Sequence, residues 1–129
     1  MEELILVISA AIANFILGTV WYGVFGKNWS RAWRGEKNIK ISKDPIPYLV
    51  SFIGSLWASY GLFLMIKHIQ PRSMTELLTI AVGTWLLIVV GLASKHYSFA
   101  GVPIRKFLME YGLDLVGITL MSIILSSYL

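Results

Sequence analysis

Three long stretches without a charged side chain constrain this chain more than any other feature. Residues 4–25, 48–66 and 77–94 contain no Asp, Glu, Lys or Arg, and they are 22, 19 and 18 residues long. About 20 apolar residues in an α-helix cross the core of a bilayer, whereas helices of soluble proteins are shorter and carry a polar face. Charged residues make up 14% of the chain, against roughly 25% in soluble domains. The sequence therefore predicts an integral membrane protein.

The fourth apolar stretch, residues 107–129, differs from the other three because it carries Glu110 and Asp114. Only 15 uncharged residues follow Asp114, so this stretch crosses a bilayer only if Asp114, together with Glu110, lies below the lipid–water interface. The second and third loops are short, which predicts that successive spans are antiparallel neighbours. We expect one all-α membrane domain, 1–129, with four transmembrane helices in a compact antiparallel bundle, at about 4–25, 47–67, 75–95 and 106–129.

Lysine and arginine gather on one side of the predicted membrane. The first loop and the third loop together hold nine of the 11 basic residues, and the second loop holds only Lys67 and Arg72. Positively charged loops stay in the cytoplasm. We therefore expect a multi-pass protein of the cell membrane with its N- and C-termini on the non-cytoplasmic side. The nine residues are Lys27, Arg31, Arg34, Lys37, Lys40, Lys43, Lys95, Arg105 and Lys106.

Aromatic and basic side chains are interleaved directly after the first span, in "WYGVFGKNWSRAWRG". Trp29 and Trp33 lie one helical turn apart on one face, with Arg31 and Arg34 toward the other side. This pattern predicts a short helix in the membrane interface, capped by Asn28, with its cations toward anionic lipid. The alternative is an aromatic belt that only anchors the end of the span. The candidate residues for lipid or a partner are Trp21, Tyr22, Lys27, Trp29, Arg31, Trp33 and Arg34.

The same aromatic residues favour lipid over nucleic acid as the partner of the basic loop, so we expect no nucleic-acid binding. Small residues then indicate where helices pack, because close approach of backbones matters more in lipid than bulky apolar contact. The second span repeats a serine every fourth residue beside a ridge of glycine and alanine, and the first span has a similar spacing. We expect these faces to meet each other or a second copy. The residues are Ala10, Asn14, Gly18, Ser51, Gly54, Ser55, Ala58, Ser59 and Gly61.

Glu110 and Asp114 are four residues apart. On a helix they therefore lie about 40° apart around the axis and about 6 Å apart along it. Lys106 lies one turn before Glu110 on the same stripe. Glu110 can pair with Lys106 as an ordinary i,i+4 ion pair, or with Lys95 or His96 at the end of the third span.

Asp114 lies about 12 Å further along the helix than Lys106. An ionised Asp at that depth costs about 2.5–3.5 kcal/mol on insertion scales, so it either stays protonated or is paired inside the bundle. The candidate partners are His96, Lys95 and Asn14. Acids inside membrane spans point to function, but structural pairing is an equal alternative. The sequence leaves both open.

The sequence gives little support to catalysis. The chain has no cysteine, which excludes disulfides and thiolate chemistry. Glu110, Asp114 and His96 could supply oxygen and nitrogen ligands, but no HxxxH or ExxH spacing supports a metal site, and His68 is expected at the opposite end of the bundle. No serine lies in a nucleophile motif. We therefore expect neither an enzyme nor a bound metal or cofactor.

Three stretches resemble an uncharacterised family of four-helix membrane proteins, known as domain of unknown function 1761. They are "NFILGTVWYGVFGKNW" (14–29), "WLLIVVGLASKHYSFAGVP" (85–103) and "KFLMEYGLDLVGITLM" (106–121). The resemblance covers the whole chain except the second span, and it implies a fold but no activity. The matching positions are Asn14, Gly18, Trp21, Tyr22, Phe25, Gly26, Lys27, Trp29, Tyr97, Phe99, Gly101, Pro103 and Gly112.

The chain departs from this family at two places. The resemblance implies Asn and His where this chain has Glu110 and Asp114, and Pro where it has Gly91. A polar position that is shared while its charge is not favours a packing role over one conserved chemistry.

Two functions follow as hypotheses. The first is a homo-oligomeric structural or accessory membrane subunit that binds lipid or a membrane partner. The second is a small transporter or ion-conducting assembly with Glu110 and Asp114 as proton or cation sites. The chain is similar to small multidrug transporters in size, but their essential acid is in the first span, which here has none at that depth. An uncovered small-residue stripe favours the first hypothesis, and a water-accessible cavity at Asp114 favours the second.

Overall fold

The computed structural model describes the backbone of residues 2–34 and 45–129 and the side chains of residues 2–25 and 45–129. The described backbone is helical except at the turns, as the composition predicts, and contains no strand. The elements are α1 (Glu2–Arg34), α2 (Pro45–Ile69), α3 (Met74–Thr84), the π-helix η1 (Trp85–Val90), α4 (Gly91–Ala100), α5 (Ile104–Leu125) and the 3-10 turn η2 (Ser126–Tyr128).

Within the described residues, four helical segments are long and apolar enough to cross a membrane, which is the number of spans that the sequence predicts. Most of their boundaries lie within a few residues of the expected ones. The third segment ends at Ala100, five residues beyond the expected end at Lys95. Ser73 caps α3, because its hydroxyl oxygen accepts a hydrogen bond from the amide of Glu76 at 3.1 Å. The segments are Glu2–Phe25, Pro45–Ile69, Met74–Ala100 and Ile104–Tyr128.

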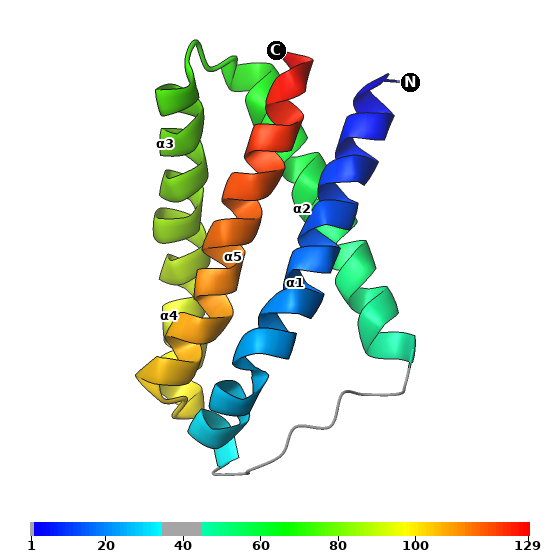
Figure 1. Cartoon of the computed structure of the whole chain (residues 1–129). Helices are drawn as coiled ribbons and strands as arrows, with labels where there is room; N and C mark the ends of the chain where they lie inside the picture. Colours follow the sequence, from blue (N-terminus) through cyan, green and yellow to red (C-terminus); the bar gives the residue numbers. More distant parts are fainter. Residues whose placement is uncertain (1, 35–44) are drawn as a thin grey trace.

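The helices are arranged around α1 and α5 (Figure 1). α1 packs against both α2 and α5, and α3 packs against the other side of α5. Figure 1 shows the N- and C-termini at the same end of the molecule and the turn between α4 and α5 at the opposite end. We call the half that contains Glu2 and Leu129 the terminal half, and the half that contains the α4–α5 turn at Gly101 the turn half.

One neighbour relation differs from the expectation. Although α2 and α3 follow each other in the chain, they make few contacts, and each contacts α5 instead. In Figure 1, α2 inclines away from α1 toward its beginning, and residues 45–51 are all exposed. Helices in lipid gain little from merely covering apolar surface, so a short loop does not force the helices it joins to pack side by side.

The core lies in the terminal half. A cluster of buried apolar side chains joins the first half of α1 to the last turns of α2 and α5 and the start of α3. The ring of Phe63 packs edge-on against Tyr128, with the ring centres 5.1 Å apart. The cluster consists of Val7, Ala10, Leu62, Phe63, Ile66, Leu77, Met121 and Leu125.

The predicted interfacial helix is not a separate element. The backbone of α1 is helical on both sides of Asn28, so no new helix begins there and Asn28 is not an N-cap. The side chains of Lys27, Trp29, Arg31, Trp33 and Arg34 lie outside the described residues. A helix of 33 residues is about 50 Å long, longer than the roughly 30 Å core of a bilayer. Contact of this extension with lipid stays a prediction.

Candidate functional site

Glu110 and Asp114 lie in the turn half, on the stripe of α5 that faces the other helices. Further along that stripe, Met121 and Leu125 are buried in the core. At the level of the two acids the side chains are only half-buried, because α2 has diverged from the other helices there. The acids therefore occupy the incompletely covered part of an inward-facing stripe.

Glu110 is paired along its own helix. Its Oε1 atom lies 3.6 Å from Nζ of Lys106, one turn earlier. Lys106 retains only 7% of its exposure, so this ion pair is shielded from solvent on the lysine side. It is one of the pairings that the four-residue spacing allows.

Asp114 has a different environment. Within residues 2–25 and 45–129, no hydrogen bond or ion pair reaches its carboxylate. No fully buried side-chain oxygen in this part of the chain lacks a partner, so the carboxylate of Asp114 reaches the protein surface. Tyr22 and Tyr111 lie within electrostatic range of both acids, and a charge on Glu110 repels one on Asp114. An ionised Asp114 therefore needs a partner from outside the described chain.

The other predicted members of the site do not join Asp114. Lys95 and His96 are exposed on α4, with no ion pair to either acid among the described residues. Asn14 donates a hydrogen bond from Nδ2 to Oγ of Ser55 at 2.9 Å. The described side chains also include no group of three His, Asp or Glu placed to hold a metal ion.

Asn14 lies at the point where three helices meet. Besides its bond to Ser55 on α2, its side-chain oxygen occupies the space into which a Cβ atom on Gly117 of α5 would project. The glycine thus allows α5 to approach the amide closely. The sequence did not predict this contact. It fixes the position of α5 about one helical turn beyond Asp114.

Two tryptophans hold the segment that carries Glu110. Nε1 of Trp21 on α1 donates to the carbonyl of Met109 at 2.9 Å, and Nε1 of Trp85 on η1 donates to the carbonyl of Tyr111 at 2.6 Å. The two carbonyls flank Glu110 in the chain. Trp21 was predicted at the lipid interface, and that role stays a prediction, but its indole nitrogen is engaged by α5. A buried indole N–H usually has a hydrogen-bond partner. The position of Trp85 within an apolar run was therefore the sequence feature that could have predicted this bond.

The small-residue face of α2 is divided between a covered and an open part. Ser55 and Ser59 face α1, where the hydroxyl of Ser59 donates to the carbonyl of Val7 at 2.7 Å. Gly54 and Ala58 on the neighbouring ridge are exposed, as is Ser51. On α1, Ala10 is fully buried, and Gly18 is half-buried. The predicted faces of the first two spans therefore meet each other in part.

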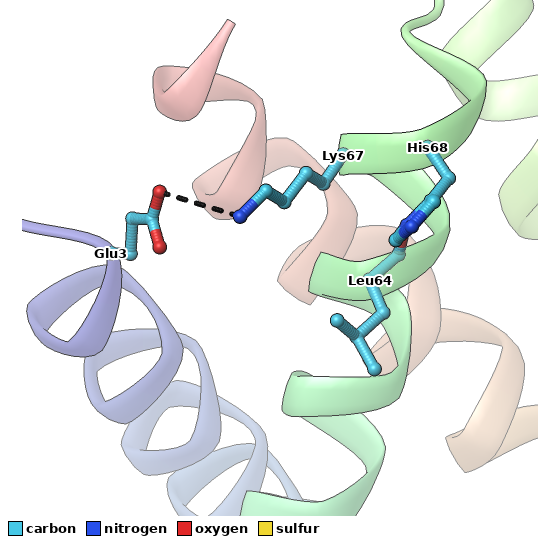
Figure 2. Close-up of polar contacts among 4 residues, drawn as sticks. All are labelled: Glu3, Leu64, Lys67 and His68. Atoms are coloured by element: carbon cyan, nitrogen blue, oxygen red, sulfur yellow. Dashed lines mark hydrogen bonds and ion pairs between the residues drawn. The ribbon is translucent and has the colours of Figure 1, made fainter.

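The terminal half has its own ion pair, far from the acids (Figure 2). Nζ of Lys67 on α2 lies 3.9 Å from Oε1 of Glu3 on α1, and both side chains are nearly half exposed. The ring of His68 is turned back along α2, with Nδ1 2.8 Å from the carbonyl oxygen of Leu64. His68 is therefore used locally and does not contact the acids of α5.

The comparison with protein families identifies one match. The family described as "Protein of unknown function (DUF1761)" matches residues 5–126, so the chain belongs to this family. None of the curated proteins and none of the solved structures matches the chain. The family confirms the resemblance seen in the sequence and assigns no activity.

Proposed function

We propose that this member of the DUF1761 family is a structural or accessory membrane subunit, without catalytic activity, that associates with itself and binds lipid or a membrane partner. The observation that carries the proposal is the open ridge on α2. Gly54 and Ala58 lie on it, and no atom outside the local helix lies within 4 Å of a Cβ atom built on Gly54. Small residues let helices approach closely in lipid, and among the described residues no other helix packs on this ridge.

The exposed part of α2 extends this argument. Its first residues, 45–51, are all exposed, and Trp57 retains 78% of its exposure. Nearly one whole side of the helix therefore faces outward. A second copy that packs on the ridge would cover α2 without disturbing its serine face on α1.

The test is to fill the ridge. The double variant Gly54→Leu, Ala58→Leu leaves the isolated chain intact, because both positions are open, but it blocks a helix from packing there. We expect the wild type to be an oligomer in nanodiscs by single-molecule photobleaching, and the double variant to be a monomer. Gly23→Leu on α1 is the matched control, since Gly23 is also exposed with free space around it. A monomeric wild type, or equal dissociation by the control, would overturn the proposal.

Sidedness belongs to the same proposal. Both termini face the non-cytoplasmic side, because nine of the 11 basic residues lie in the loops of the opposite side and basic loops stay in the cytoplasm. In the variant Gln70→Cys the thiol should then react with a membrane-impermeant maleimide added to intact cells, and in Ser98→Cys, an exposed position near the α4–α5 turn, it should not.

Proton or cation transport is the second candidate, and Asp114 is the observation that favours it. A carboxylate within a span, at the protein surface and without a partner in the described chain, can exchange a proton or bind a cation from outside. Two shallow, open hollows in the described residues lie elsewhere. One, of about 500 Å³, runs along α3 between Thr75 and Gly83, and the other, of about 250 Å³, lies beside Pro71 and Leu129.

Asp114→Asn separates the two candidates. If Asp114 pairs with a partner helix, its neutralisation leaves that partner alone, which is costly for buried pairs. The variant would then melt well below the wild type at neutral pH and would lose its oligomer. If Asp114 serves transport, Asn is neutral or stabilising, since functional acids are kept at a cost to stability. Proton or cation flux into liposomes should then disappear in the variant.

A further inference from the structure

The turn between α4 and α5 presents two cationic side chains that no described residue pairs with. Within the described part of the chain, no ion pair or hydrogen bond reaches the side chains of Lys95 or Arg105, and both are exposed. Residues 77–109 contain no Asp or Glu, and the first acid beyond the turn, Glu110, pairs with Lys106 and not with Lys95 or Arg105. Within the described residues, therefore, no carboxylate is paired with Lys95 or Arg105.

An apolar side chain accompanies these cations. Phe99 retains 93% of its exposure, the largest value among the exposed apolar side chains of the described residues. Lys95 and Phe99 lie four residues apart in α4, and thus on one face of the helix. On α5, Ile104 precedes Arg105 and is also exposed. A cation beside an exposed ring is the combination that proteins place at the headgroup level of a membrane.

The turn itself is held in a defined shape. Gly101 has a left-handed backbone, with φ of 67°, which a glycine adopts without strain. The amide of Val102 donates to the carbonyl of Tyr97 at 3.1 Å. The rings of Tyr97 and Phe107 then join the two helices, with their centres 4.6 Å apart. The cations and Phe99 are therefore presented on an ordered turn.

We propose that the α4–α5 turn binds the headgroup of an anionic glycerophospholipid of the surrounding bilayer. Arg105 and Lys95 bind the phosphate, where the guanidinium of Arg105 can donate two parallel hydrogen bonds. Phe99 lies at the boundary between headgroups and acyl chains. The charge of the turn selects a lipid with a net negative charge, and Phe99 adds contact with any lipid.

This inference rests on the proposed function for one premise only, that the chain lies in a bilayer. It adds the class of lipid and the site that binds it. It does not depend on self-association through α2. An acidic segment of a partner protein is the competing occupant, and it differs in that purified protein would then show no preference among lipids.

The experiment measures lipid retention on purified full-length protein. Delipidated protein in a neutral detergent is mixed with equal amounts of phosphatidylglycerol and phosphatidylcholine, and the bound lipids are counted by native mass spectrometry. The variant Lys95→Gln, Arg105→Gln removes two charges from the turn. The matched control Lys67→Gln, Arg72→Gln removes two charges from the exposed side chains of the terminal half. Each cation near a membrane surface contributes about a fivefold preference for anionic lipid.

The wild type should retain phosphatidylglycerol in preference to phosphatidylcholine. We expect the turn variant to lose about tenfold or more of this preference, and the control to change it by less than about twofold. Phe99→Ala should lower the retention of both lipids and keep their ratio. Equal losses in the turn variant and the control, or no preference in the wild type, would overturn the proposal. The oligomer size read from the same spectra tests self-association separately.

Discussion

The two halves of the molecule are held together by different interactions. In the terminal half, eight buried apolar side chains from α1, α2, α3 and α5 form one cluster, and the ion pair between Glu3 and Lys67 is exposed at its edge. In the turn half, indole hydrogen bonds and a contact between tilted aromatic rings join the helices. The charged pair of Lys106 and Glu110 is partly enclosed there.

The two halves therefore specify the contacts between their helices in different ways. Lipid tails are as apolar as a leucine side chain, so burial alone does not favour helix contact in a membrane. The terminal half relies on close fit, with Ala10 and Leu125 fully buried. The turn half relies on directional polar contacts from Trp21 and Trp85. The half with the looser fit is also the half that carries the two acids.

The largest expected effect tests the fitted half. Leu125→Ala removes a side chain that is fully buried in the cluster and leaves a cavity. We expect a loss of about 2–3 kcal/mol in the free energy of unfolding. This value is at the low end for such changes, because lipid also solvates the side chain in the unfolded state. Leu108→Ala, an exposed position on the same helix, should cost less than about 0.5 kcal/mol. Unfolding in mixed micelles with increasing dodecyl sulfate measures both, and equal losses would contradict a terminal core.

The second prediction compares the two ion pairs. Lys106→Gln removes a positive charge from beside Glu110 in a partly enclosed site, and we expect a loss of about 1–2 kcal/mol. Lys67→Gln breaks the exposed pair with Glu3 and should cost less than about 0.5 kcal/mol. The same unfolding titration decides between them. If Lys67→Gln proves the more costly change, the enclosed environment of Lys106 is not what stabilises its pair.

The third prediction concerns the junction of the two halves. A Cβ atom on Gly117 would overlap the side-chain amide of Asn14, so Gly117→Ala should displace that amide from Ser55 and cost about 1 kcal/mol. Gly112→Ala should be neutral or stabilising by up to about 1 kcal/mol, since its nearest atom would be a ring carbon of Trp21 at 3.7 Å. In an Asn14→Ala background the Gly117 change should lose its cost, and a persistent cost would refute the mechanism.

The smallest expected effect is in the turn half. Trp85→Phe keeps a ring but removes the hydrogen bond to the carbonyl of Tyr111, which should cost about 0.6 kcal/mol, the average for such bonds between helices in membranes. Trp57→Phe is the control, because Trp57 is 78% exposed. Far-ultraviolet circular dichroism during thermal unfolding can resolve the difference. Equal stability of the two variants would mean that the bond adds nothing to the turn half.

The features that sequence reasoning identified are those that depend on local spacing. Charge-free runs indicated three of the four spans, and the four-residue spacing of Lys106 and Glu110 anticipated their ion pair. Each of these depends on residues within a single helix, so no knowledge of the tertiary arrangement was needed.

The features that sequence reasoning missed depend on which helices pack against each other. Short loops suggested that α2 and α3 are neighbours, but α5 contacts both of them instead. The bond between Trp85 and Tyr111 joins residues 26 positions apart. The lack of a side chain at Gly117 is explained only by the tertiary structure, which places the amide of Asn14 next to it. For Asp114, the sequence supplied three candidate partners, and none of them contacts it among the described residues.

The π-helix η1 has a consequence for the direction in which the third span points. Leu77 of α3 and Tyr97 of α4 both face α5, the first within the apolar cluster and the second through Phe107. In an uninterrupted α-helix, residues 20 positions apart point about 160° away from each other. The wider π-turns, which take more residues per turn, shift the phase of the helix between these two positions. This shift brings Leu77 and Tyr97 toward the same side of the third span, as an insertion in a coiled coil changes the phase of its hydrophobic repeat.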